Sequence, residues 1–112
     1  MLSPSGWWLA VAPMDLRCGM DRLMVAVQTA LGRDAFDGGA YVFRNRSGTR
    51  IKVLCCDAQG VWLCVRRLSK GHFVWPSGGD AACELSPEAF AWLCAGVDWR
   101  RLSDRAMPRH VV

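Results

Sequence analysis

The chain has 112 residues, of which 52% are hydrophobic and 21% charged, and its formal net charge is +4. This length suits one domain with a modest core, and the composition excludes an intrinsically disordered chain. The sequence lacks an apolar run of roughly 18 residues, the length of a membrane span. The apolar stretch 7–13 is shorter and has no basic residues before it, unlike a signal peptide. We therefore expect a cytoplasmic protein without a membrane partner, and nucleoid association is a further option.

The six cysteines do not follow a pattern typical of metal binding or of a secreted disulfide scaffold. They are Cys18, Cys55, Cys56, Cys64, Cys83 and Cys94, and histidine occurs only at positions 72 and 110. Structural zinc sites usually draw their ligands from Cys-x-x-Cys pairs, and this chain has none. We expect free thiols packed as small hydrophobic side chains, and neither a metal nor a cofactor. A minor alternative is oxidation of Cys55 with Cys64, which are diagonal neighbours on one hairpin face.

The first 39 residues predict a strand, a helix and a loop. An apolar stretch at residues 6–12 indicates a strand that ends at a proline. Asp15 is placed to cap a helix that begins near Leu16, and Gly32 is placed to end it. The apolar positions that recur at helical spacing are Leu16, Met20, Leu23, Val27 and Leu31. The polar, glycine-rich segment 33–39 predicts a loop.

The central part of the chain predicts consecutive β-hairpins. Residues 41–44 and 49–56 flank Asn45-Arg46-Ser47-Gly48, and a second turn at 57–60 leads into residues 61–68. The second turn predicts three cross-strand pairs: Cys56 with Val61, Cys55 with Trp62, and Val53 with Cys64. One face then carries Leu54, Cys56, Val61, Leu63 and Val65, and the other carries Ile51, Val53, Cys55, Trp62 and Cys64. Because a surface sheet would alternate apolar with polar residues, we expect helices or a second subunit to cover both faces.

The last third predicts a short strand at 73–75 and a second helix. Ser86 is placed to cap this helix, Pro87 takes its first position, and Leu85 can pack on Phe90. Its expected buried stripe is Phe90, Leu93, Cys94 and Val97. We expect one α+β domain at 1–99, with a mainly antiparallel β-sheet of 4–6 short strands and two flanking helices. The basic tail 100–112 is expected to be loosely held.

The excess positive charge lies on residues 42–76, which contain seven basic residues and a single acid, Asp57. We call these seven the basic cluster: Arg44, Arg46, Arg50, Lys52, Arg66, Arg67 and Lys70. Arg17, Arg100 and Arg101 are candidate secondary contacts. Cations gathered at one end of a sheet predict a polyanionic partner, with nucleic acid first and an acidic protein second. The third alternative is that these side chains solvate a sheet edge.

The residues do not indicate an enzyme. Most acids occupy expected caps and turns, and Asp21, on the first predicted helix, is the least explained of them. Tyr41 is expected in the core and His72 on a turn. No glycine-rich phosphate loop is present. Trp62 and Trp75 are expected in the core, and stacking on nucleic-acid bases is the alternative.

Three blocks together carry a resemblance to a known family. They are Met14-Asp15-Leu16-Arg17-Cys18-Gly19-Met20-Asp21-Arg22-Leu23, the whole of 42–76, and the segment from Leu85-Ser86-Pro87-Glu88 to Asp98-Trp99-Arg100. The chain resembles the TnpB accessory proteins of bacterial insertion sequences of the IS sixty-six type. It departs from their pattern at Cys18, Cys55-Cys56 and Ala58, and large-to-small changes on a strand cost packing energy.

The resemblance implies a non-catalytic accessory protein of DNA transposition that assists a separate transposase. No catalytic residues of that family are carried over. Combined with the basic cluster, it predicts binding to DNA at the element ends, and a homodimer is a further option. The alternative is a protein-interaction subunit that dimerises or docks on the transposase without contacting DNA. An experiment with element ends, this protein and the transposase separates these alternatives.

Overall fold

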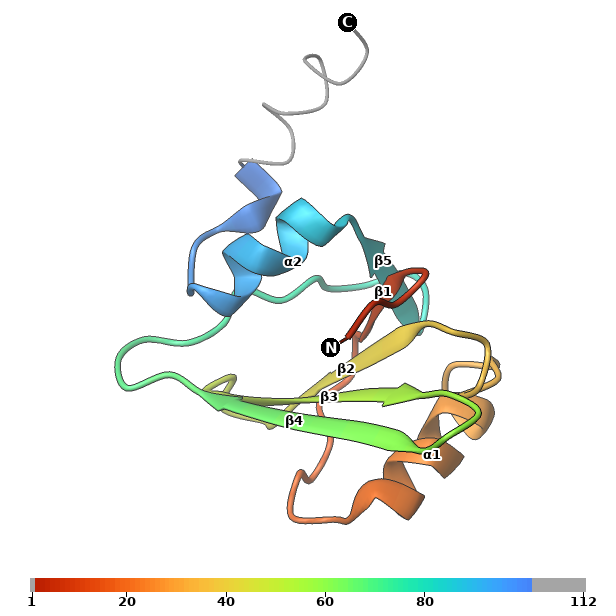
Figure 1. Ribbon diagram of the computed structural model, residues 1–112. Helices are drawn as coiled ribbons and strands as arrows, with labels where there is room; N and C mark the ends of the chain where they lie inside the picture. The colour runs from red at the N-terminus through yellow and green to blue at the C-terminus, as the bar shows by residue number, and fades with distance from the viewer. Residues whose placement is uncertain (1, 102–112) are drawn as a thin grey trace, which may run out of the picture.

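A computed structural model describes residues 2–101, which form a five-stranded sheet with a helix on each face (Figure 1). The strands are β1 (Trp7–Ala10), β2 (Ala40–Arg44), β3 (Arg50–Cys56), β4 (Val61–Arg67) and β5 (Ala82–Leu85). The helices are α1 (Met20–Thr29) and α2 (Pro87–Cys94), and residues 99–101 form a further helical turn. The predicted α+β class is confirmed. No helix among the described residues is long and apolar enough to cross a bilayer.

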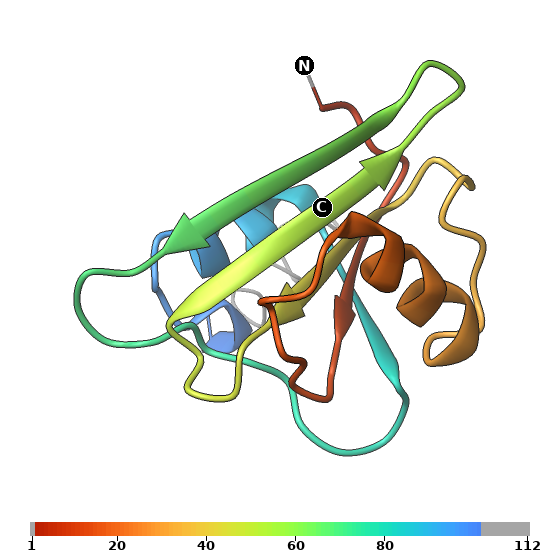
Figure 2. The ribbon, with the colours of Figure 1, turned by 90° about the horizontal axis from the view of Figure 1, so that it is seen from below.

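The strand order is β4-β3-β2-β1-β5, and every neighbouring pair is antiparallel except β1 with β2. The parallel pair arises because α1 crosses over one face between them, as a parallel connection requires. Figures 1 and 2 show α1 on one side of the sheet and α2 on the other. The two ends of the sheet order are therefore β4 and β5, which lie on separate edges.

The predicted hairpin register is confirmed. Cys56 pairs with Val61, Cys55 with Trp62, and Val53 with Cys64. The preceding turn is held by the Asn45 side chain, whose Oδ1 accepts the backbone N–H groups of Thr49 at 3.0 Å and Arg50 at 3.1 Å. An Asn side chain that bonds the backbone in this way stabilises a tight turn.

Strand alternation divides the core into two layers. Leu54 and Cys56 face α1 with Leu23 and Val27, whereas Val53 and Cys55 face α2 with Leu93. Both faces of β2 and β3 are therefore covered by helices. Strand β4 lies at the edge, and there Trp62 is 48% exposed and Val65 58% exposed. The expectation of a core position is thus wrong for Trp62, because the helices do not reach far enough to bury the outer strand.

Helix α1 begins at Met20 and not near Leu16, so its predicted start is wrong by four residues. Asp15 does not cap it, because its carboxylate accepts the backbone N–H and the guanidinium of Arg17. Residues 16–18 form a turn from which Leu16 still packs into the α1-side core. The N-cap position is Gly19, which offers no side-chain oxygen. Leu16 therefore fits the helical spacing of apolar residues although it lies before the helix.

The predicted strand at 73–75 is also wrong, because this segment runs as an irregular loop. Two tryptophans fix it: Trp75 Nε1 donates to Ala10 O at 2.8 Å, and Trp99 Nε1 donates to Val74 O at 2.7 Å. The edge beside β1 is occupied by β5, a strand that the sequence pattern does not predict. Its four residues are too few to show a period of two.

Helix α2 begins as predicted. The Ser86 side chain accepts the Ala89 N–H at 3.0 Å, and Pro87 is the first helical residue. The helix ends at Cys94 and is closed by Gly96, which has φ +78 and donates to Leu93 O, while Val97 donates to Trp92 O. Val97 lies beyond this end and is exposed, so its place in the predicted buried stripe is wrong. The predicted tail lies outside the described residues from position 102 onward.

Candidate nucleic-acid interface

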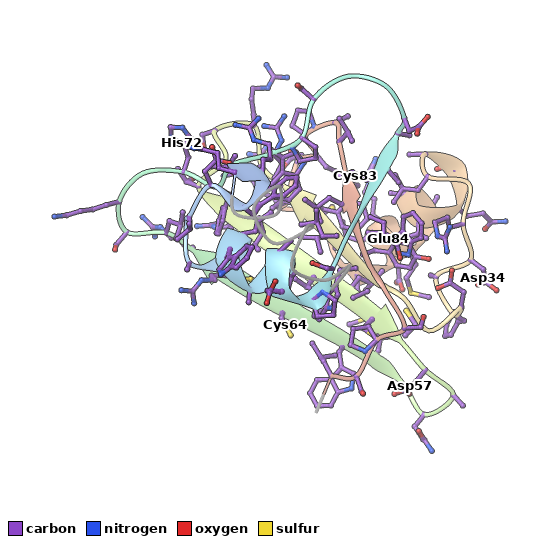
Figure 3. The ribbon with its side chains drawn as sticks, turned by 90° about the horizontal axis from the view of Figure 1, so that it is seen from above. Asp34, Asp57, Cys64, His72, Cys83 and Glu84 are labelled. Atoms are coloured by element: carbon purple, nitrogen blue, oxygen red, sulfur yellow. The ribbon has the colours of Figure 1, made fainter. Side chains whose placement is uncertain are left out.

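The basic cluster occupies the end of the hairpins away from the turn at Asp57, but strand alternation places its members on two faces. Arg44 pairs with Ile51, and Ile51 pairs with Arg66, so this cross-strand row faces α2. Arg50 pairs with Arg67 and stands two residues from Lys52, so these three face the α1 side. Figure 3 labels Asp57 and His72 at opposite ends of the molecule, with the basic end on the side of His72.

The two arginines on the α2 side are engaged within the protein. Arg66 Nε donates to Cys94 O, the last residue of α2, at 2.6 Å. The Arg44 guanidinium lies 5.9 Å from the centre of the Trp75 ring and donates to Arg46 O at 3.3 Å. Arg44 Nε is buried and has no hydrogen-bond partner within the described range 2–101. These contacts hold α2 and the 73–75 loop against the sheet end.

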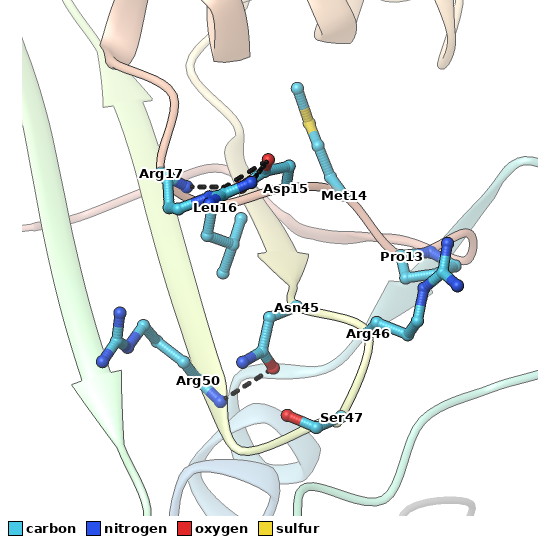
Figure 4. Close-up of a pocket in the computed structure, with 9 residues that line it drawn as sticks. All are labelled: Pro13, Met14, Asp15, Leu16, Arg17, Asn45, Arg46, Ser47 and Arg50. Atoms are coloured by element: carbon cyan, nitrogen blue, oxygen red, sulfur yellow. Dashed lines mark hydrogen bonds and ion pairs between the residues drawn. The ribbon is translucent and has the colours of Figure 1, made fainter.

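On the α1 side, an open groove separates the segment before α1 from the turn between β2 and β3. We call it the basic groove, and it is lined by Pro13, Met14, Asp15, Leu16, Arg17, Asn45, Arg46, Ser47 and Arg50 (Figure 4). Arg46 is exposed and Arg50 half-buried on one wall. Arg67 lies directly across the hairpin from Arg50. The structure therefore brings together three members of the basic cluster at one surface.

Arg17 stands on the opposite wall of the basic groove, so the secondary candidate adjoins the primary ones. Its Nη2 lies 2.7 Å from the Asp15 carboxylate, and both side chains are exposed. The side-chain hydrogen bond from Arg17 holds the pKa of Asp15 well below its usual range. Arg17 therefore brings a charge that Asp15 already partly neutralises.

The remaining candidates lie apart from the groove. Lys52 Nζ donates to Cys18 O at 3.1 Å and ties the segment before α1 to β3. Lys70 is exposed in the loop after β4. Arg100 pairs with Asp98 at 3.2 Å, and Arg101 follows it in the helical turn at the α2 end. Fewer of these cations therefore lie together at the groove than their closeness in the sequence suggests.

None of the seven basic-cluster residues forms an ion pair with a carboxylate of residues 2–101. The three ion pairs found there join Arg17 with Asp15, Arg33 with Asp37, and Arg100 with Asp98. Within residues 2–101, no carboxylate therefore neutralises the charges of Arg46, Arg50 and Arg67. Uncompensated guanidinium groups that share a surface attract phosphate.

Arg33 and Asp37, which lie in the predicted loop 33–39, form a network with Tyr41. The Tyr41 hydroxyl donates to Asp37 Oδ2 at 2.6 Å and accepts from Arg33 Nε at 3.1 Å. The Arg33 guanidinium also stacks on the Trp8 ring at 3.8 Å. Tyr41 is fully buried, as expected. The network holds residues 33–39 against the start of β2, and the sequence does not show that Trp8, which lies on β1, takes part in it.

Burial, followed by the hydrogen bond to Asp37, raises the pKa of Tyr41 from 10.0 to about 12. The stability contributed by the neutral hydroxyl is therefore present below pH 10 and lost as the pH rises through about 12. We expect the free energy of unfolding to fall across this window, and to fall less steeply in Tyr41→Phe, which cannot ionise. Urea unfolding at several pH values measures both slopes, and equal slopes would contradict the assignment.

The other residues considered for chemistry are Asp21, His72 and the cysteines. Residues 2–101 contain no group of three His, Cys, Asp or Glu side chains that could hold a metal ion. Asp21 is exposed on α1, and His72 is exposed in the loop after β4. Burial raises the pKa values of Cys55 and Cys56, which keeps these thiols protonated. All six cysteines are free.

Comparison with known proteins gives one family and two close relatives. The family model described as IS66 Orf2 like protein matches residues 5–104. The uncharacterized protein y4hO of Sinorhizobium fredii (strain NBRC 101917 / NGR234) is 40% identical over 104 residues, which cover 93% of this chain and 90% of the relative. The uncharacterized protein y4jC of the same strain is 36% identical over 101 residues, covering 90% and 86%. No solved structure matches the chain.

Proposed function

The chain belongs to the IS66 Orf2-like family of transposition accessory proteins, and we propose that it assists the transposase by binding DNA through the basic groove. The observation that carries this proposal is the surface shared by Arg46, Arg50 and Arg67, whose charges have no carboxylate partner among residues 2–101. The protein serves as a non-catalytic factor at the element ends, and the transposase of the same element supplies the cleavage chemistry.

The expected contact is with the phosphate backbone and not with base edges. Arg46 and Arg50 stand at an open groove beside a turn, where they can reach phosphates of a duplex laid across the hairpin end. Trp75 is unsuited to stacking on bases, since its indole N–H is bound to Ala10 O and its ring lies near Arg44. Phosphate contacts give affinity that depends strongly on salt and little on sequence.

Salt-dependent binding to a duplex of the element end tests this proposal. We expect the slope of log affinity against log salt to become shallower by about one unit for each of Arg46→Ala, Arg50→Ala and Arg67→Ala. Arg22→Ala is the matched control, because Arg22 is an exposed arginine on α1 outside the basic groove. It removes the same charge and is expected to leave the slope unchanged.

Two results would reject the DNA contact. One is the absence of binding at low salt, and the other is an equal loss of affinity in the Arg22→Ala control and in the Arg46→Ala, Arg50→Ala and Arg67→Ala variants. Co-elution with the transposase after nuclease treatment, combined with either result, would instead support the protein-interaction subunit. A scrambled duplex is expected to bind about as well as the element end, since phosphates carry no sequence information.

A further inference from the structure

The outer edge of β4 has the backbone pattern of an unused pairing surface. Asp57 and Gly60 exchange backbone hydrogen bonds at the turn, and Leu68 N donates to Thr49 O at 2.9 Å at the other end. Because antiparallel pairs alternate, Trp62, Cys64 and Arg66 use their backbone groups on β3. The residues whose backbone groups point outward are then Val61, Leu63, Val65 and Arg67. No backbone partner lies beyond them among the described residues.

The side chains of β4 also lack the usual protection of an edge strand. Residues 61–65 carry no charge, and Val65 is 58% exposed on the α1 side while Trp62 is 48% exposed on the α2 side. Natural proteins generally blunt such edges with charges, prolines or bulges. Here the charges stand at one end of the strand, at Arg66 and Arg67. An edge of this kind favours a specific strand partner.

We propose that a second copy of this chain pairs its β4 antiparallel to the first, with Cys64 opposite Cys64. In this register Leu63 of one copy pairs with Val65 of the other, and Val61 pairs with Arg67. All four outward-facing residues of each strand then enter the ladder, and the two five-stranded sheets join into one. The interface is symmetric about a two-fold axis, as most homodimer interfaces are.

The position of the charges selects this orientation. Parallel pairing would set Arg66 and Arg67 beside their own copies, whereas antiparallel pairing places them at opposite ends. It also sets Arg66 of each copy across from the exposed Trp62 of the other, on the α2 face. Arg66 is already held there by its bond to Cys94 O at 2.6 Å, so its guanidinium is positioned for contact with an aromatic ring. On the α1 face, Leu63 covers the exposed Val65 of the other copy.

This interface lies outside the basic groove, and Arg67 is the one residue that enters both proposals. The interface uses the long edge of β4, and the basic groove lies on the turn between β2 and β3. The two grooves of the dimer would lie toward opposite ends of the joined sheet, because the strands run in opposite directions. Figure 3 labels Cys64 on the outer strand of the sheet, at the centre of the proposed interface.

Mild oxidation of the full chain gives the most direct test. A non-hydrogen-bonded antiparallel pair has its Cα atoms about 4.5 Å apart, which lies inside the range of disulfides. We expect a covalent dimer that reductant reverses, that Cys64→Ser abolishes, and that Cys83→Ser leaves intact. Cys83 is the matched control, a half-buried thiol on the opposite edge strand β5. A covalent dimer that survives Cys64→Ser would overturn the register.

Sedimentation at high salt without DNA tests the non-covalent dimer. We expect Val65→Lys to weaken dimerisation at least tenfold, because it buries a charge against the other strand. Val25→Lys is the control, because Val25 on α1 has the same exposed fraction of 58%. At about 100 µM protein, a dimer with a Kd of about 10 µM would be mostly formed. A wild-type protein that is still monomeric at this concentration would contradict the proposal. An equal loss of dimerisation in Val65→Lys and Val25→Lys would contradict it as well.

Discussion

Trp99→Ala is expected to lower the free energy of unfolding by about 3–5 kcal/mol, the range for removing a buried tryptophan. Trp99 is 7% exposed in the α2-side core, and its indole N–H donates to Val74 O. The substitution therefore opens a cavity and also releases the irregular 73–75 loop. Small domains are stable by about 5–15 kcal/mol in total, so the loss is a large share. Urea unfolding monitored by circular dichroism measures it.

Trp99→Phe separates the two parts of this effect. It keeps most of the ring volume but leaves Val74 O without its donor, so a smaller loss of about 1–3 kcal/mol is expected. If Trp99→Ala costs no more than Trp99→Phe, packing of the ring is not what holds the loop. The loop matters for the sheet end, because Trp75 and Arg44 meet there.

Leu23→Ala is expected to cost about 2–5 kcal/mol, because it removes a fully buried side chain from the layer between α1 and the sheet. Helix α1 has ten residues and no side-chain cap at Gly19, so it depends on this packing. Loss of the α1 layer also exposes Leu54 and Cys56 on β3. Thermal and urea unfolding both report the change.

Val25→Ala is the control on the same helix. Val25 is exposed, and alanine favours a helix more than valine does, so the free energy of unfolding should change by less than about 0.5 kcal/mol. A comparable loss in both variants would mean that burial of Leu23 against β3 is not what stabilises α1, because Val25→Ala raises the helix propensity and removes no buried side chain.

The local patterns of the chain predicted the parts of the fold that neighbouring residues define. The Asn45-Arg46-Ser47-Gly48 and Asp57–Gly60 turns set the hairpin register, because a tight turn leaves few alternative pairings. Ser86 and Pro87 set the start of α2, because a cap satisfies donors within one turn of itself. The charge count along residues 42–76 likewise located the basic end of the sheet.

Contacts between distant segments determined the rest. Which face each arginine occupies follows from strand alternation and from where the helices lie. Arg66 therefore bonds α2 and Arg44 lies near the Trp75 ring, while Arg46 and Arg50 line a groove with Arg17. Helix α1 begins later than predicted because Asp15 bonds Arg17. The 73–75 loop is irregular because the indole N–H groups of Trp75 and Trp99 bind backbone oxygens of distant segments. Periodicity in a sequence reports which residues are apolar, but burial and hydrogen bonding depend on partners that only the folded chain brings together.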